Sequence, residues 1–142
     1  MDCEFCDGDG GPVLWRDGFC RIVRAPSQDY AGFCRVILNR HAREMTDLAP
    51  AERARLMDAV FACESALREL FDPDKINLAS LGNLVPHLHW HVIARHADDP
   101  HFPDPIWAAP RRASAPPSAL RNDVSDARLG TRLAALLAQA AA

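Results

Sequence analysis

Residues 87–93 read HLHWHVI, in which three of the chain's six histidines alternate with large apolar residues. Successive side chains of an extended strand point to opposite faces of its sheet, so this spacing groups the imidazoles on one face and Leu88, Trp90 and Val92 on the other. On a helix the same imidazoles would diverge by about 200° per step. The segment therefore predicts a β-strand with one buried apolar face and one face that is free for chemistry.

The amino-acid composition is that of a single globular domain. The chain has 142 residues, 49% of them hydrophobic and 25% charged, which is enough for a sizeable apolar core. A formal net charge of only -3 argues against a general binder of nucleic acid or of acidic membranes, because such proteins need a clustered basic face. With no apolar stretch of about 20 residues and no basic, apolar leader, we expect a cytoplasmic protein. Its five cysteines should then be reduced.

The segments around the histidines predict an α+β fold with an antiparallel sheet. The apolar, β-branched run at 33–38 predicts a central strand, and the runs at 76–80 and 88–94 predict two strands that can pair as a hairpin. A further hairpin is expected around the turn at Asp17. Apolar residues recur at three- and four-residue steps between 50 and 71, which predicts a long amphipathic helix that backs the sheet.

We divide the chain into one domain and a tail. Residues 1–107 form the domain, and within them the turn-rich residues 1–11 are a candidate zinc knuckle. The residues at 108–118, rich in Pro, Ala and Arg, are predicted to be a linker. Residues 119–142 then carry a C-terminal helix, although Gly130 weakens its middle by ~1 kcal/mol relative to alanine.

The histidine triplet has three chemically different readings. Chance alone would produce such a triplet in roughly one chain per hundred. As a metal-binding module, the protein would use all three imidazoles as ligands. As a catalyst, it would use a neutral imidazole to attack a phosphoryl centre and form a phosphoramidate, while the neighbouring imidazoles contact phosphate oxygens or protonate the leaving group.

The HLHWHVI segment resembles the signature of the histidine triad (HIT) family, His-φ-His-φ-His-φ-φ, where φ is an apolar residue. The likeness continues in FCRVILNRH at 33–41, in the helix that follows, and in NLASLGNLVPHLHWHVIAR at 77–95, so it covers roughly residues 1–107. The NLVP lead-in and the DDPHFPDPIW tail are similar to a bacterial branch of the family. The resemblance implies a HIT-like antiparallel sheet with one main packing helix, and a homodimer.

The same resemblance implies catalytic roles for the three histidines. His89, the middle one, would be the nucleophile that becomes nucleotidylated, and His91 would assist at the phosphate and the leaving group. His87 completes the triad and, without a metal, would orient the nucleophile together with His41. The reaction would be hydrolysis or transfer at the α-phosphate of a dinucleoside polyphosphate or a nucleoside phosphoramidate, with no cofactor required. The alternative is a nucleotide-binding regulator that has kept the pocket and lost the chemistry.

The resemblance also implies three substrate-binding residues. Asn83 stands four residues before the first histidine of the triad, where family members usually carry a glutamine that hydrogen-bonds a phosphate oxygen. Asn77 lies near the position of another polar residue of the family. Asp29 lies in the loop before the central strand, from which family members often hold the ribose hydroxyls.

The first residues contain a C-x-x-C motif, Cys3-Glu-Phe-Cys6. A chance pair or a redox couple are its simple readings, but a redox couple needs a strand before it and a helix after it, whereas this pair is followed by glycines. The members of the family that bind zinc use an N-terminal C-x-x-C, a histidine after the central strand and the first triad histidine. The resemblance therefore implies a structural zinc site with four protein ligands, which leaves no open position for a water. The matching residues are Cys3, Cys6, His41 and His87.

The remaining histidines, cysteines and tryptophans have structural readings. His96 and His101 are expected at or near solvent, because they lie in or next to the Pro-rich stretch after the histidine strand. Trp107 is expected to be a core or interface residue rather than a platform for a base. Cysteines on apolar faces are expected to serve packing, and these are Cys20, Cys34 and Cys63.

Overall fold

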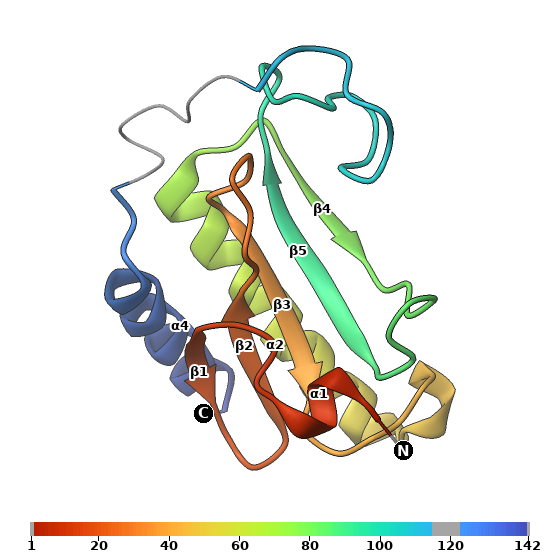
Figure 1. The fold of residues 1–142 in the computed structure, drawn as a ribbon. Coiled ribbons are helices and arrows are strands. Elements are labelled where there is room, and N and C mark those ends of the chain that lie inside the picture. The colour runs from red at the N-terminus through yellow and green to blue at the C-terminus, as the bar shows by residue number, and fades with distance from the viewer. Residues whose placement is uncertain (1, 115–122, 142) are drawn as a thin grey trace.

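The computed structural model describes residues 2–114 and 123–141 and confirms the expected α+β fold. Five antiparallel strands form one sheet in the order β1-β2-β3-β5-β4 (Figure 1). The strands are β1 (Val13–Arg16), β2 (Cys20–Arg24), β3 (Phe33–Leu38), β4 (Lys75–Ala79) and β5 (His89–Arg95). The helices are α1 (Glu4–Asp7), the 3-10 turn η1 (Met45–Asp47), α2 (Pro50–Phe71) and α4 (Asp126–Ala140).

The histidine strand starts at His89, one residue later than the predicted strand at 88–94 and two residues after the first histidine of the triplet. The ladder with β3 begins at the pair formed by Ile37 and His89. His87 lies in the preceding turn, where its N–H donates to the carbonyl of Val85 at 2.8 Å. Of the three histidines, only His89 and His91 therefore share a face of the sheet. The side chain of His87 is not part of the alternating pattern of the strand. The expected hairpin of β4 and β5 is present and antiparallel.

The two long helices, α2 and α4, pack on the sheet face opposite the histidines. α2 begins at Pro50, whose missing N–H costs nothing in a first turn, and ends at Phe71, after which Asp72 takes the left-handed conformation. Its apolar stripe joins the inward residues of the strands in one core, and α4 contacts both α2 and β1 (Figure 1). Buried contributions to that core come from Leu56, Val60, Cys63, Leu67, Leu129 and Leu133, and also from Cys20 and Cys34, as expected for packing cysteines.

The histidine face carries two smaller apolar clusters with the site between them. One cluster attaches the N-terminal turn to the sheet, and the other attaches the residues after β5, here called the post-β5 segment (96–112). Between these clusters, β3 and β5 present Arg35, His89 and His91. The first cluster is Cys3, Phe5, Val23 and Ile37, and the second is Ala25, Tyr30, Phe33 and Ile93.

The tail is described only in part. Residues 115–122, which include the end of the predicted linker and the start of the predicted tail, lie outside the described residues, as do 1 and 142. The predicted C-terminal helix is found as α4, with the Ser125 hydroxyl accepting from the N–H of Arg128 at its start. No helix in the described ranges is both long and apolar enough to cross a membrane.

Candidate active site

His89 and His91 stand side by side on β5, with ring centroids 4.9 Å apart and ring planes at 84°. Both line a pocket of about 370 Å³, a volume within the usual range for small-molecule sites. The pocket is formed where the N-terminal turn, the loop before His87 and the post-β5 segment meet the sheet. The side chains from these elements include Phe5, Arg35, Asn83, His89, His91 and Trp107.

The tautomer of His89 follows from its hydrogen bond to the backbone. Its Nδ1 lies 2.6 Å from the carbonyl oxygen of His87. A carbonyl oxygen only accepts, so Nδ1 carries the proton and the lone pair of the neutral ring is on Nε2. Nε2 has no hydrogen-bond partner among the described residues and is not fully buried, and the His89 side chain lines the pocket. Burial lowers the pKa of His89, which favours this neutral form.

His91 is held among aromatic rings. The Trp107 ring lies 5.0 Å from it and the Phe33 ring 5.7 Å, both edge-on, and its buried Nδ1 has no hydrogen-bond partner in the part of the chain that the structure describes. Burial, together with the charges of His89 and Arg35, lowers the pKa of His91 from 6.5 to about 4. His91 is therefore neutral at pH 7 in this structure.

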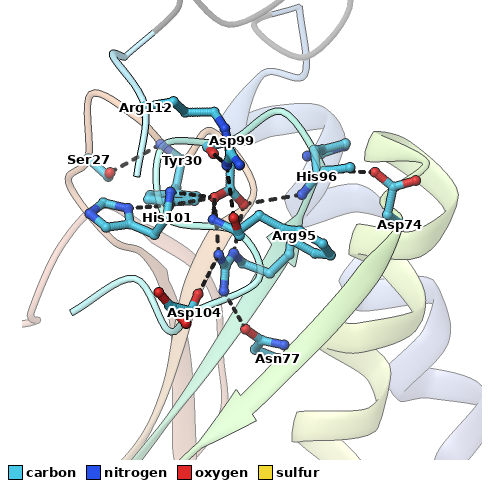
Figure 2. A network of polar contacts seen from close by, with 12 residues as sticks. Ser27, Tyr30, Asp74, Asn77, Arg95, His96, Asp99, His101, Asp104 and Arg112 are labelled. Carbon is cyan, nitrogen blue, oxygen red and sulfur yellow. Dashed lines mark hydrogen bonds and ion pairs between the residues drawn. The ribbon is translucent and has the colours of Figure 1, made fainter. Parts of the chain in front are cut away.

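The structure brings one of the three predicted substrate-binding residues to the histidines. Asn83 lines the same pocket as His89 and His91. Asn77 does not line this pocket, and its Oδ1 accepts from Nη1 of Arg95 at 2.7 Å (Figure 2). Asp29 lies in the loop before β3 and is not part of the pocket wall. Substrate contacts for these two residues remain predictions.

The four residues of the predicted zinc site come together. The ligand atoms of Cys3, Cys6, His41 and His87 all lie within 4.8 Å of one another. Nδ1 of His87 is 3.4 Å from Sγ of Cys3 and 3.5 Å from Sγ of Cys6. A tetrahedral zinc with usual bond lengths separates a sulfur and a nitrogen ligand by about 3.6 Å, so the cluster has the dimensions of such a site.

His87 is oriented as a metal-binding imidazole usually is. Its Nε2 lies 2.6 Å from the carbonyl oxygen of Leu38, so that nitrogen carries the proton and Nδ1 turns its lone pair to the two sulfurs. His41 approaches from the other side, with Nδ1 3.5 Å from Sγ of Cys6. Two thiols and two imidazoles in this arrangement could hold a zinc ion, and His87 is the triad member that belongs to this cluster.

A buried ion pair fixes the post-β5 segment (Figure 2). Nε and Nη2 of Arg95 donate to the two carboxylate oxygens of Asp99 at 2.7 and 3.0 Å, and both side chains are almost wholly buried. Arg95 also donates to the carbonyl of Asp104, which ties the segment to the end of β5. Asp99 further accepts from the Tyr30 hydroxyl and from the backbone N–H groups of His96, His101 and Phe102.

Two expectations from the sequence are corrected in this segment. His96 is buried at 8% exposure and its Nε2 donates to the carbonyl of Phe71 at 3.1 Å, while His101 bonds the Tyr30 hydroxyl at 2.6 Å. His96 is therefore not the solvent residue that the proline content suggested, whereas His101 is partly buried, which agrees with a position near solvent. Trp107 is 51% exposed and forms a wall of the pocket, so it is not the core residue that was one of its two expected roles, and the interface role stays a prediction.

Sequence reasoning also missed Arg35 as a pocket residue. A signal was available, because Arg35 is the sole charged residue within the strand 33–38 and pairs directly with His91 in the β3–β5 register. For Trp107 the sequence held no comparable signal, since its position depends on the fold of an irregular segment.

The comparisons with known proteins agree with this geometry. An α+β protein with paired imidazoles in a pocket on the open face of its sheet is the class that the structure defines. The HIT domain model matches residues 11–98, well over half of the chain, so the protein belongs to the histidine triad (HIT) family. This is a family of nucleotide-binding proteins that includes nucleotide hydrolases and transferases. A search of curated proteins found no match.

Solved structures of bacterial histidine triad proteins resemble the chain over nearly its whole length. One from Bradyrhizobium japonicum is 26% identical with a TM-score of 0.67, and the match covers 91% of this chain and 92% of that one. One from Marinobacter aquaeolei is 27% identical with a TM-score of 0.66, covering 92% and 91%. One from Sinorhizobium meliloti is 25% identical with a TM-score of 0.68, covering 87% and 90%.

Proposed function

We propose that this protein is a nucleotide hydrolase or nucleotidyl transferase that acts at the α-phosphate of a nucleotide conjugate through a covalent nucleotidyl-histidine on His89. The observation that carries the proposal is the state of His89. Its Nδ1–H is held by the carbonyl of His87, and Nε2 keeps its lone pair without a hydrogen-bond partner among the described residues, on a side chain that lines the pocket. A neutral, oriented imidazole with an open nitrogen is what nucleophilic attack on phosphorus requires.

The proposed reaction has two displacements. In the first, Nε2 of His89 forms a bond to the α-phosphorus while the bond to the leaving group breaks, and the bonding electron pair goes with the leaving group. In the second, water attacks the same phosphorus, the P–N bond breaks, and its electron pair returns to Nε2 while the water proton passes to solvent. His91 and the amide of Asn83, both on the pocket wall, would contact the phosphate oxygens.

A structural zinc site on Cys3, Cys6, His41 and His87 is the second part of the proposal. The donor set and its spacing support it, as does the orientation of His87. Zinc there would act as a cross-link between the N-terminal turn and the sheet. Phe5 lies between the two cysteines in the sequence and packs edge-on against the His89 ring at 4.9 Å, so the cross-link would also steady one wall of the pocket.

The decisive experiment looks for the covalent intermediate. Wild-type protein is quenched with acid-free denaturant during turnover of diadenosine tetraphosphate or adenosine 5′-phosphoramidate, digested, and examined by mass spectrometry. We expect an added mononucleotide on the peptide that contains His89. His89→Ala should show neither the adduct nor turnover while keeping its thermal unfolding temperature and its metal content. Binding without turnover or adduct for both substrates would favour a nucleotide-binding regulator instead.

A site that uses all three histidines as metal ligands receives no support from the geometry. In the part of the chain that the structure describes, the one group of metal-ligand type includes His87 and excludes His89 and His91. We also propose a homodimer, in line with the family resemblance, and sedimentation velocity measures it directly.

A further inference from the structure

Arg35 occupies the centre of the candidate active site. It lies on β3 directly opposite His91 on β5, and its side chain lines the pocket together with His89, His91 and Asn83. Directly opposed residues of an antiparallel pair have Cβ atoms about 5 Å apart, so the guanidinium starts within reach of anything bound at the histidines. The structure thus places a permanent positive charge beside the two imidazoles.

The hydrogen-bonding capacity of Arg35 is almost unused. Within the described residues its Nε is buried without a partner, and its one hydrogen bond, from Nη1 to the carbonyl of Gly10, has a length of 3.5 Å at the outer limit for such bonds. No carboxylate among the described residues lies within 4 Å of it. Glu4, an exposed residue at the pocket edge, acts on it only through the longer-range field.

Two other arginines on the same face of the sheet show how a structural arginine looks in this fold. Arg21 donates to the carbonyls of Asp9, Phe5 and Gly8 and to the side chain of Asn39. Arg95 donates to both oxygens of Asp99, to Asn77 and to the carbonyl of Asp104. Both use nearly all of their N–H groups within the protein, and Arg35 does not.

A half-buried guanidinium without a counter-charge is unfavourable by itself. Burial lowers the pKa of Arg35, which measures the lost hydration of its cation. An anion in the pocket would restore both the charge balance and the missing hydrogen bonds, and phosphate suits the planar fork of arginine because it accepts two parallel N–H bonds. The unused donors therefore point to a phosphate-bearing ligand.

We propose that Arg35 binds the phosphate chain of the leaving group, so that the site prefers phosphoanhydride conjugates such as dinucleoside polyphosphates to phosphoramidates of uncharged amines. This inference rests on the proposed function, because it assigns the leaving group of that same reaction. The guanidinium would hold the phosphates beyond the α-phosphorus, and it would balance the negative charge that collects on the bridging oxygen when the bond from the α-phosphorus to that oxygen breaks.

The protonation state of His91 supports the same choice of substrate. An amine leaves phosphorus only after it gains a proton, whereas a phosphate chain leaves as an anion and needs none. His91 is neutral at pH 7, with a pKa of about 4 caused first by burial, so it is a poor proton donor to an amine. Arg35 can bind an anionic leaving group, and His91 is a poor proton donor to an amine. Both features favour a phosphoanhydride substrate over a phosphoramidate.

Steady-state kinetics with two substrates test the proposal. Diadenosine tetraphosphate has a charged leaving group, and adenosine 5′-phosphoramidate releases ammonia from the same nucleotide. Arg35→Leu should lower kcat/KM for the tetraphosphate by on the order of 50-fold and for the phosphoramidate by no more than about threefold, the loss expected for charge-assisted hydrogen bonds. Arg35→Lys should recover part of the loss. Arg132→Leu, which removes one positive charge from α4 behind the sheet, should match wild type on both substrates.

Equal losses on both substrates would overturn the proposal and assign Arg35 a structural role through Gly10. A binding arm separates this outcome from failure of the proposed function. Calorimetric titration with ATP and with AMP needs no turnover, and we expect wild type to bind ATP at least tenfold more tightly, with the difference lost in Arg35→Leu. That result would support Arg35 even if no adduct formed on His89. Equal affinities in wild type, no binding of either nucleotide, or a preference for ATP that persists in Arg35→Leu would each overturn it.

Discussion

The carbonyl oxygen of His87 accepts the Nδ1–H of His89 at 2.6 Å, so the first residue of the triad orients the second through its backbone. The side chain of His87 meanwhile faces the opposite way, toward the sulfurs of Cys3 and Cys6. His87 therefore contributes its side chain to the cysteine and histidine cluster and its backbone carbonyl to the orientation of His89, the proposed nucleophile. Its imidazole can serve as a metal ligand while its peptide group sets the tautomer of the attacking ring.

Removal of a cysteine from the cluster should release the metal without abolishing the pocket. Cys6→Ser and His41→Asn should reduce bound zinc from about one equivalent to below a tenth, because a four-ligand structural site loses most of its affinity with one ligand. Metal analysis by plasma mass spectrometry measures this, and thermal unfolding should fall in the variants and in chelator-treated wild type.

Cys20→Ala is the matched control for those variants. Cys20 is buried in the core beneath α2 and is not part of the cysteine and histidine cluster, and burial raises the pKa of its thiol to about 12. Its replacement should lower stability and leave the zinc content unchanged. Full zinc retention in Cys6→Ser would remove the cluster from consideration as a metal site.

Asp99→Asn should destabilise the fold strongly. The side chains of Arg95 and Asp99 are only 2% and 5% exposed, and breaking such a pair leaves an uncompensated buried charge, which costs about 3–5 kcal/mol. Urea unfolding measures the loss. Asp104→Asn is the control on the same segment, since its ion pair with Arg111 is exposed at the surface, and its midpoint should stay near that of wild type.

Acid should weaken the protein in two separate steps. The pKa of His91 is lowered from 6.5 to about 4 in the folded protein. Between these two pH values the unfolded chain is protonated at His91 and the folded chain is not. The free energy of unfolding therefore falls by up to about 3 kcal/mol as the pH drops from 6.5 to 4. The guanidinium of Arg95 and three backbone N–H groups hold the pKa of Asp99 well below its usual range despite burial, so its contribution is present above pH 3.8 and is lost below it.

The first of these steps can be assigned by substitution. Unfolding free energies of wild type and His91→Asn, measured between pH 4 and 7, should differ in slope, with the variant flatter because it lacks the titrating ring. Parallel curves over that range would show that another group is responsible. The Asp99 step should persist in the variant below pH 3.8.

The regular elements could be predicted from sequence because local patterns determine them. The strand at 33–38 and the helix at 50–71 have the predicted bounds, since a continuous apolar run and a three- and four-residue stripe leave few alternatives. The start of β5 was placed too early, because the N–H of Leu88 donates to the carbonyl of Ala42 from a distant loop and removes that residue from the ladder. Alternation of residue types contains no information about such a partner.

Some residues of the candidate site could likewise be predicted from local motifs, and others could not. The metal-ligand set could be named from its motifs, and its four members converge. Arg35 and Trp107 were missed because their place in the pocket depends on which strand lies opposite and on how an irregular segment folds. The hydrogen bond from Arg95 to the amide oxygen of Asn77 spans two strands and has no local signature either, and the substrate role of Asn77 stays a prediction.

Gly130→Ala should destabilise the protein although alanine is the better helix former. A Cβ at this position would lie 2.7 Å from the carbonyl oxygen of Leu14 on β1, and a backbone atom cannot move aside cheaply. The strain should exceed the gain of about 1 kcal/mol in helix propensity, for a net loss of about 1–2 kcal/mol. Thr131→Ala, one residue along on the exposed side of α4, should change the unfolding free energy by less than about 0.5 kcal/mol. A stabilised Gly130→Ala would contradict the close packing of α4 on β1.

Trp107→Ala should expose His91 and raise its pKa toward 6.5. The indole lies edge-on to the imidazole at 5.0 Å and is held there by the post-β5 segment, so its removal admits water to a ring whose lowered pKa comes mainly from burial. NMR titration of the His91 ring protons measures the change directly, and kcat/KM for the proposed substrates should fall as the pocket loses a wall. Trp107→Phe keeps an aromatic edge in place and should hold the pKa near that of wild type. If the His91 pKa stayed near 4 in Trp107→Ala, Phe33 and the sheet alone would account for its burial, and Trp107 would be a pocket wall without influence on the histidine.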